Sequence, residues 1–84
     1  MDLSKYVQTI VTEQDFVEFV QKFAAEVREN PAKYENRNLP DFLEAMASWT
    51  ADRDGYYHNI DQPVPQIENW RAIADLLVAS SLYE

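Results

Sequence analysis

The chain has 84 residues, 46% of them hydrophobic and 13% aromatic, which is enough for one ordered domain and too few for two. Its formal net charge is −8, with 7 Lys and Arg against 15 Asp and Glu. This balance argues against nucleic-acid binding and against binding to anionic membranes, because both need clustered cations.

The chain has no Cys and a single Gly. Disulfides, thiolate metal sites and glycine-rich phosphate loops are therefore excluded. The first residues lack the basic start and long apolar stretch of a signal peptide, and no apolar run approaches the ~18 residues of a membrane-spanning helix. We expect a cytoplasmic protein, and the absence of Cys suits a reducing compartment.

The N-terminal segment is predicted to be extended. Residues 6–11, YVQTIV, are rich in β-branched and aromatic types, which favour strand-like backbone. Thr12 follows as a predicted helix N-cap, and Asp15 lies three residues later, where the acid of a capping box belongs.

The first long helix is predicted over residues 13–29. Its apolar residues repeat at helical spacing and form one continuous stripe, with charged residues on the opposite side. Pro31 ends the helix because it disfavours helical backbone at Asn30. The stripe consists of Phe16, Phe19, Val20, Phe23, Ala24 and Val27. Residues 30–38 are a polar connection in which Tyr34 is the expected anchor.

A second helix is predicted over residues 39–52, with Asn38 as its cap. Gly55 is expected to take the left-handed conformation that follows a helix end. Residues 56–69 then form a loop, which Pro63 and Pro65 stiffen. The inward stripe of this helix is Leu39, Phe42, Leu43, Met46, Trp49 and Thr50.

The last helix, predicted over residues 68–83, is apolar on two sides. One line contains Trp70, Ile73, Ala74, Leu77 and Ser81, and the other contains Ala72, Leu76, Ala79 and Tyr83. A helix that is apolar all round needs cover on most of its circumference. It is either central in the fold or uses its second line, from Ala72 to Tyr83, to meet another protein, by self-association or through a different protein partner. The predicted architecture is an all-α domain over residues 1–84, a small three-helix bundle with an extended N-terminal segment.

Candidate catalytic and metal-binding patterns are weak. The stretch DRDG at 52–55 resembles the start of a calcium loop, but Gly55 is fourth rather than sixth and Pro63 occupies the twelfth position. His58 is the only His and has no nucleophile in a recognisable setting. A magnesium site from Asp41, Glu44 and Asp52 is conceivable, although an exposed helix face explains these acids equally well. We expect no enzyme, no cofactor and no metal site.

The segment around the adjacent Tyr56 and Tyr57 is the best candidate for a partner interface. Tyr combines a large apolar ring with a polar tip, which is typical of interface anchors. The alternative is that one ring packs under the loop and the other is incidentally exposed. The expected interface contains Glu44, Asp52, Asp54, Tyr56, Tyr57, His58 and Asp61. Residues 39–84 contain eight acids and only two Arg, so a charged partner would be basic.

The chain resembles a family of short, uncharacterised bacterial proteins classed as a domain of unknown function, from about Asp15 to Glu84. The resemblance rests on an aromatic-Glu-Asn step, on LPDFLEAMASWTADRDGYY and on the closing NWRAIADLLVASSLYE. Tyr34 stands where that family is expected to have Trp. The family pattern singles out Asn36, Leu39, Phe42, Leu43, Glu44, Ala45, Trp49, Asp52, Gly55, Tyr56, Tyr57, Trp70 and Tyr83.

The resemblance implies a small, helical, bacterial and cytoplasmic protein, and it supplies no activity. The best functional interpretation is a non-enzymatic protein-binding module that inhibits a basic partner, in the manner of an immunity protein or an antitoxin. The alternatives are a structural homo-oligomer, for which a homodimer is the simplest form, and a carboxylate-metal enzyme.

Overall fold

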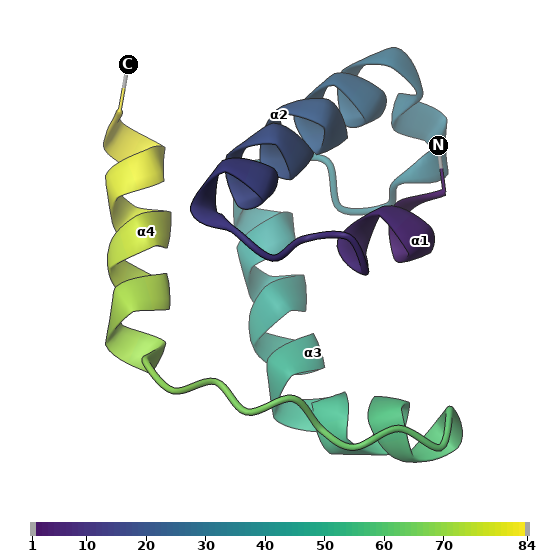
Figure 1. Cartoon of the computed structure of the whole chain (residues 1–84). Coiled ribbons are helices and arrows are strands. Elements are labelled where there is room, and N and C mark those ends of the chain that lie inside the picture. The colour runs from purple at the N-terminus through teal and green to yellow at the C-terminus, as the bar shows by residue number, and fades with distance from the viewer. Residues whose placement is uncertain (1, 84) are drawn as a thin grey trace. The chain divides into compact units, whose positions relative to one another are not determined.

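The computed structural model describes residues 2–83, and these contain four α-helices, one short 3-10 helix and no strand (Figure 1). The predicted all-α class is confirmed, and three of the helices are long, as expected. The chain separates into two compact units, Met1–Trp49 and Thr50–Glu84, with the boundary inside the third α-helix. Each unit is described by itself, so the single domain over residues 1–84 stays a prediction.

The N-terminal segment begins with a short helix, α1 (Leu3–Val7), which includes Tyr6 and Val7 of the segment 6–11 that was predicted to be extended. Residues 8–9 form a turn, and residues 10–11 are not helical. Asp2 caps this helix by accepting a hydrogen bond from the backbone N–H of Lys5. The ring of Tyr6 lies 5.4 Å from the ring of Phe19 on the next helix. The prediction was wrong because strand preference is weak, and a cap and one aromatic contact outweigh it.

Helix α2 (Glu13–Glu29) begins and ends where the sequence predicts. The Thr12 hydroxyl accepts from the Asp15 backbone N–H at 3.0 Å, and the Asp15 carboxylate accepts from the Thr12 N–H at 3.1 Å. These two bonds are the predicted capping box. At the other end, Asn30 is the C-cap and the 3-10 helix η1 (Pro31–Lys33) follows.

The carboxylate of Asp15 also has a consequence for the pH dependence of stability. Hydrogen bonds from the backbone N–H groups of Val11 and Thr12 lower the pKa of Asp15 from its usual value of 3.8. Because the pKa is lower in the folded chain, the stabilisation is present above 3.8 and is lost as the pH falls through the folded pKa. The variant Asp15→Asn should therefore be less stable than the wild type at neutral pH, with the difference shrinking in acid.

This expectation is tested by urea unfolding at a series of pH values between neutral and strongly acidic. Glu13→Gln is the control, since it removes an acid from the same helical turn without removing a hydrogen bond to the backbone. A stability gap between wild type and Asp15→Asn that stays constant across the series would contradict the proposed role of the carboxylate.

A row of four aromatic rings holds the first unit together. Tyr6 contacts Phe19, Phe19 contacts Phe23 at 5.7 Å, and Phe23 contacts Tyr34 at 5.8 Å between ring centroids. The row joins α1, α2 and the polar connection, so Tyr34 is the anchor that the sequence predicts. Such offset and tilted ring pairs stabilise by about 0.5–1.5 kcal/mol each beyond their burial.

Glu26 is the one buried residue in the described part of the chain, at 7% exposure. Its carboxylate accepts from the Asn30 amide at 3.2 and 3.3 Å and pairs with the Lys33 ammonium at 3.5 Å. A buried carboxylate is tolerated only when hydrogen-bonded or paired, and both conditions hold here. These contacts fasten η1 onto the end of α2.

Helix α3 (Leu39–Asn59) starts as predicted and ends later than predicted. The Asn38 side chain accepts from the Asp41 backbone N–H at 3.0 Å, which is the expected cap. The helix was predicted to end at residue 52 with Gly55 in a left-handed conformation. That prediction was wrong, because Gly55 lies inside the helix and has no positive φ.

The end of α3 is made by Asp61, which has a φ of 55° and is the only non-glycine residue with positive φ in the described chain. The N–H of Gln62 donates to the carbonyl of Tyr57 at 2.9 Å, and the N–H of Asp61 donates to that of His58 at 3.1 Å. This pair of bonds is the Schellman motif. Asp is among the few residues that enter left-handed backbone at low cost, so it replaces Gly here.

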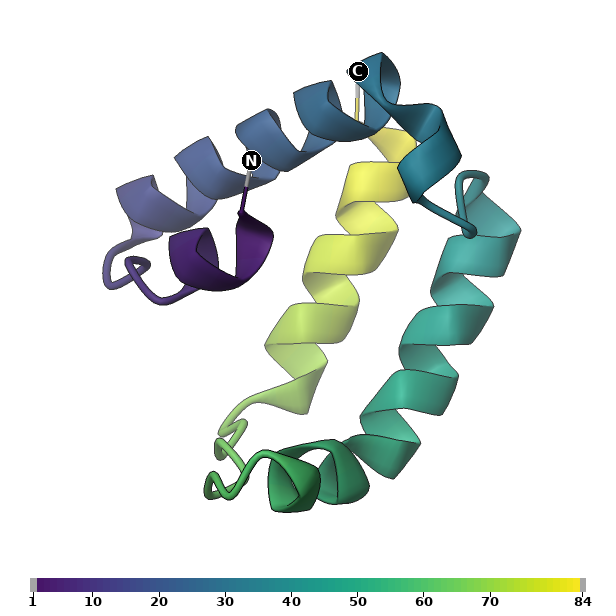
Figure 2. The same ribbon diagram turned by 90° about the vertical axis from the view of Figure 1, so that its right-hand side faces the viewer.

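Helix α4 (Trp70–Leu82) follows the loop of the second unit (Figure 2). Asn69 caps it by accepting from the backbone N–H of Ala72 at 2.9 Å. The guanidinium carbon of Arg53 lies 5.0 Å from the centroid of the Trp70 ring, and Arg53 also donates to the carbonyl of Thr50 at 3.0 Å. This cation–π contact connects α3 with the start of α4.

Candidate functional site

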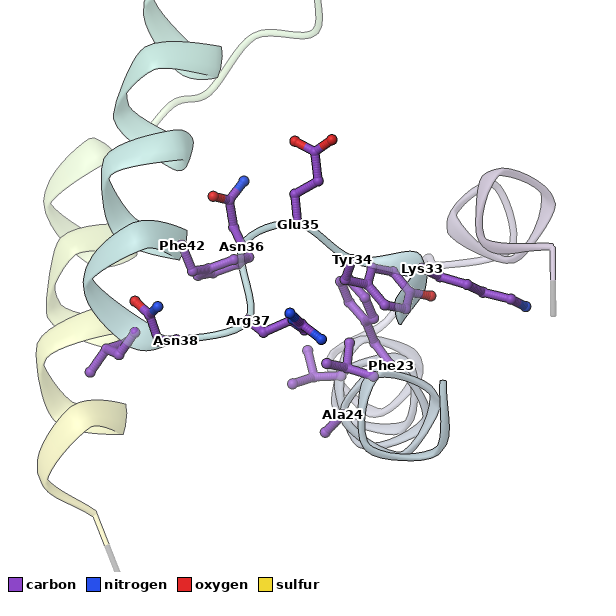
Figure 3. A pocket seen from close by; sticks show the side chains of 12 residues that line it. Phe23, Ala24, Lys33, Tyr34, Glu35, Asn36, Arg37, Asn38 and Phe42 are labelled. Carbon is purple, nitrogen blue, oxygen red and sulfur yellow. The ribbon is translucent and has the colours of Figure 1, made fainter. Parts of the chain in front are cut away.

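The first unit contains a groove of about 650 Å³ beside the polar connection (Figure 3). Its walls come from the second half of α2, from the connection that follows η1, and from the first turn of α3. The lining residues are Val20, Phe23, Ala24, Val27, Lys33, Tyr34, Glu35, Asn36, Arg37, Asn38, Leu39 and Phe42. All of them lie within residues 1–49, so the groove belongs to one compact unit.

The α2 wall of the groove is the apolar stripe that the sequence predicts. Val20, Phe23, Ala24 and Val27 follow helical spacing and therefore share one face. Glu26 holds η1 against the end of α2 beside this face. The residues that follow η1 therefore run back alongside the stripe and line the groove with it.

The α3 wall consists of Leu39 and Phe42, which are 54% and 41% exposed. They lie three residues apart and so occupy the same side of the first turn. Asn38 caps this turn, which fixes where the wall begins. Apolar side chains therefore line the groove from two helices, and solvent covers them.

The rim of the groove carries charge of both signs. Lys33 is paired with Glu26, and Asn38 is used in the cap of α3. Arg37 makes no hydrogen bond or ion pair with any residue between 2 and 83. In Figure 3 its side chain extends over the groove toward α2, whereas the carboxylate of Glu35 points away.

The groove suits apolar side chains accompanied by one anionic group. Its volume lies within the roughly 300–1,000 Å³ of typical binding clefts, and its walls are mostly hydrophobic. The guanidinium of Arg37 offers planar, paired donors to a carboxylate. Grooves of this kind receive one face of an amphipathic helix, with apolar residues spaced by three and four positions.

A second hollow, of about 490 Å³, lies between α1 and the start of α2, and most of the residues that line it are charged or polar. Its lining includes Asp15, Glu18 and Lys22. The Lys22 ammonium lies 5.3 Å from the centroid of the Tyr6 ring, and Asp15 is engaged in the α2 cap. These side chains already have structural partners, so the hollow offers less to a ligand than the groove does.

The structure divides the residues predicted as a partner interface. Glu44 lies on the part of α3 that belongs to the first unit, and the other six lie in the second unit. Of these six, Asp52, Asp54, Tyr56, Tyr57 and His58 are on α3, so the last three are helical instead of in the loop predicted for residues 56–69. Asp61 has a structural role, since it ends that helix.

The two adjacent Tyr residues contact each other. Their ring centroids are 4.9 Å apart and the rings are nearly perpendicular. Tyr56 is 48% exposed and Tyr57 is partly buried. The arrangement places one amphipathic ring at the surface of α3 with Asp52 four residues before it on the same helix, as an aromatic interface with an acidic border requires.

The residues predicted for self-association are all exposed, three of them on α4 and the fourth, Tyr83, at its C-cap. They are Ala72, Leu76, Ala79 and Tyr83, of which Leu76 is 48% exposed and Tyr83 88%. Leu82 is 78% exposed on the same helix. No hydrophobic side chain is buried anywhere in residues 2–83, so this exposure is shared by every helix of the structure.

Sequence analysis missed the groove and the position of Arg37 in it. It assigned the two apolar stripes to the core and residues 30–38 to a connection. One signal was present: the resemblance pattern singles out Asn36, Leu39 and Phe42, which all line the groove. Their proximity in the sequence, together with the anchor Tyr34, points to the same place.

No three side chains of His, Cys, Asp or Glu within residues 2–83 lie together in a way that would hold a metal ion. Over the same residues, no helix combines the length and the apolar character needed to cross a membrane.

Comparison with known proteins gives one match. The model of a family of unknown function, DUF7660, matches residues 12–84. No curated protein and no solved structure matches the chain. Helix α1 lies outside the matched residues, whereas the groove, α3 and α4 lie within them.

Proposed function

Because the chain belongs to the family of unknown function DUF7660, we propose its role from its own surface: a non-enzymatic protein-binding module whose groove receives a helix of a protein partner. One observation carries the proposal. The groove is lined by apolar side chains from two helices, and none of them is buried. Exposed apolar surface of this kind marks interaction sites, because its burial by a partner is favourable.

Photo-crosslinking tests this proposal with a matched pair of positions. A photoreactive phenylalanine analogue replaces Phe42, which lines the groove, or Phe16, which lies on α2 outside it. Both side chains are 41% exposed, so general reactivity should be the same. We expect protein adducts in the source cell from position 42 and few from position 16. Equal adducts at the two positions, or none at position 42, would overturn the proposal.

A second candidate function is inhibition of a basic partner, as an immunity protein or an antitoxin does. The exposed ring of Tyr56 and its contact with Tyr57 support it. Acids outnumber Arg53 and Arg71 in the second unit, and Arg53 is engaged by Trp70. Acidic side chains would speed the encounter with a basic protein, and the Tyr ring would supply contact area.

If the chain inhibits a basic partner, binding of that partner should depend strongly on salt concentration. A photoreactive analogue at Tyr56 should capture a protein of basic isoelectric point at low ionic strength and much less of it at high ionic strength, where surface charges are screened. Capture of an acidic protein, or capture that does not respond to salt, would exclude the inhibitor of a basic partner. We further infer a bacterial and cytoplasmic setting, and the absence of Cys supports the reducing compartment that the cytoplasm provides.

A further inference from the structure

We propose that the occupant of the groove is helix α4 of a second copy of this chain, so that two copies form a closed dimer. The inference rests on the proposed function, because it names the partner of the same groove. Two observations carry it: the apolar character of α4 and the complementary charges of Arg37 and Asp75.

Helix α4 has the composition that the groove requires. Between Trp70 and Leu82 its only charged residues are Arg71 and Asp75. Most of its large apolar side chains are exposed, including Ile73, Leu76 and Val78, whereas Leu77 is partly buried. A helix that is apolar on several sides is favoured in a buried position, and a second chain is one way to bury it.

The charges of the groove and of α4 are complementary. Arg37 extends over an apolar surface without a partner (Figure 3), and Asp75 is the only acid between Trp70 and Leu82. Asp75 makes no hydrogen bond or ion pair with the described residues either. A carboxylate bound to a guanidinium in a largely apolar contact forms strong, paired hydrogen bonds.

The position of Asp75 on α4 suits this contact. It lies three residues after Ala72 and four before Ala79, so all three share one side of the helix. Leu76 adjoins this side. Small side chains at positions 72 and 79 allow the backbone of α4 to approach an apolar surface closely. In the proposed contact this side of α4 faces the groove, and the Asp75 carboxylate pairs with Arg37 on its rim.

In the proposed dimer each groove holds α4 of the other copy. The two contacts are then identical and related by a two-fold axis, so no groove and no α4 is left without a partner. Two identical contacts double the apolar area removed from water. A foreign helix would satisfy the groove but would leave the apolar face of α4 exposed.

Sedimentation velocity of the full chain over a range of concentrations tests the proposal. The wild type should sediment as a dimer, and the reversals Arg37→Glu and Asp75→Arg should each raise the dissociation constant by at least about a hundredfold, since each places like charges together at both contacts. A wild type that is monomeric at every concentration would overturn the inference.

A mixture of the two charge-reversal variants, each expected not to dimerise alone, provides the sharper test. In a heterodimer of Arg37→Glu with Asp75→Arg, one contact keeps the native pair and the other has the reversed pair. We expect the mixture to form dimers that neither variant forms alone. A mixture that stays monomeric, or a wild-type dimer that neither reversal weakens, shows that these residues do not meet across the interface.

Controls separate this result from a loss of folding. Arg28→Glu reverses an Arg on α2 that does not line the groove, and it should dimerise like the wild type. Helix content by circular dichroism should be unchanged in every variant. If a reversal unfolds the chain, Arg37→Gln and Asp75→Asn replace it, and each should still weaken the dimer measurably.

The outcomes also separate this inference from the proposed function. A monomeric wild type that crosslinks through position 42 to a different protein overturns the proposed dimer and supports the proposal that the groove binds a protein. A monomer without adducts at position 42 overturns both. A dimer whose adducts at position 42 join two copies of this chain through α4 supports both.

Discussion

Replacing Phe23 with Ala should lower the free energy of unfolding by about 2–3 kcal/mol, the largest loss we expect from one apolar substitution in the first unit. Phe23 is the central ring of the aromatic row, in contact with both Phe19 and Tyr34. Its removal separates α2 from the connection that forms one side of the groove.

The expected loss of stability for Phe23→Ala is set by two effects. Truncation of a fully buried Phe to Ala costs about 3–5 kcal/mol. Phe23 is only partly buried, which reduces the transfer contribution. The loss of two ring contacts adds about 0.5–1.5 kcal/mol each to this reduced cost.

Phe16→Ala is the matched control for this substitution. Phe16 lies on the same helix, is 41% exposed and has no ring contact with another described aromatic residue. It should cost less than about 1 kcal/mol, as surface substitutions usually do. Urea unfolding followed by circular dichroism measures both variants. Equal losses would show that the aromatic row does not hold the unit together.

Replacing Gly55 with Ala and replacing it with Pro should change the stability of the chain in opposite directions. Gly55→Ala should stabilise the chain by about 0.5–1 kcal/mol, because Gly in a helix interior is less favourable than Ala. A Cβ at this position meets no atom within 4 Å, so no steric cost offsets the gain. Gly55→Pro should destabilise by about 3 kcal/mol or more, since it removes a helical hydrogen bond and clashes with the preceding turn.

The sign of the Gly55→Ala effect tests where α3 ends. If the helix stopped at residue 52 and Gly55 were left-handed, Ala would be unfavourable by about 1–2 kcal/mol. Because the structure continues the helix to Asn59, the melting temperature should rise by about 2–8 °C instead. A lower melting temperature for Gly55→Ala would contradict the length of α3.

Local signals were sufficient for the starts of α2 and α3 and for α2 as a whole. Thr12 with Asp15, Asn38 with Asp41, and Pro31 each act on backbone groups within four residues of themselves. Capping and proline effects of this kind need no information from the rest of the chain. The apolar stripes were equally predictable, because helical periodicity alone places their residues on one face.

Two elements depended on contacts that the sequence pattern does not contain. Helix α1 takes Tyr6 and Val7 out of the segment predicted to be extended, and the ring of Tyr6 contacts Phe19 on another helix. Helix α3 continues through Gly55 because Asp61 provides the left-handed residue that ends it six positions later. A Gly permits a helix end without requiring one, so composition does not choose between the two sites.

By itself, the sequence determined the all-α class, the acidic character, the α2 boundaries and which apolar residues share a face. Tertiary structure alone decided that residues 33–38 turn back along the α2 stripe and leave Arg37 over a groove. The physical reason is the range of the interactions. Periodicity and capping act over three or four residues. The Glu26–Lys33 pair and the Phe23–Tyr34 contact instead join α2 to the segment beyond its end, where helical spacing no longer predicts which residues meet.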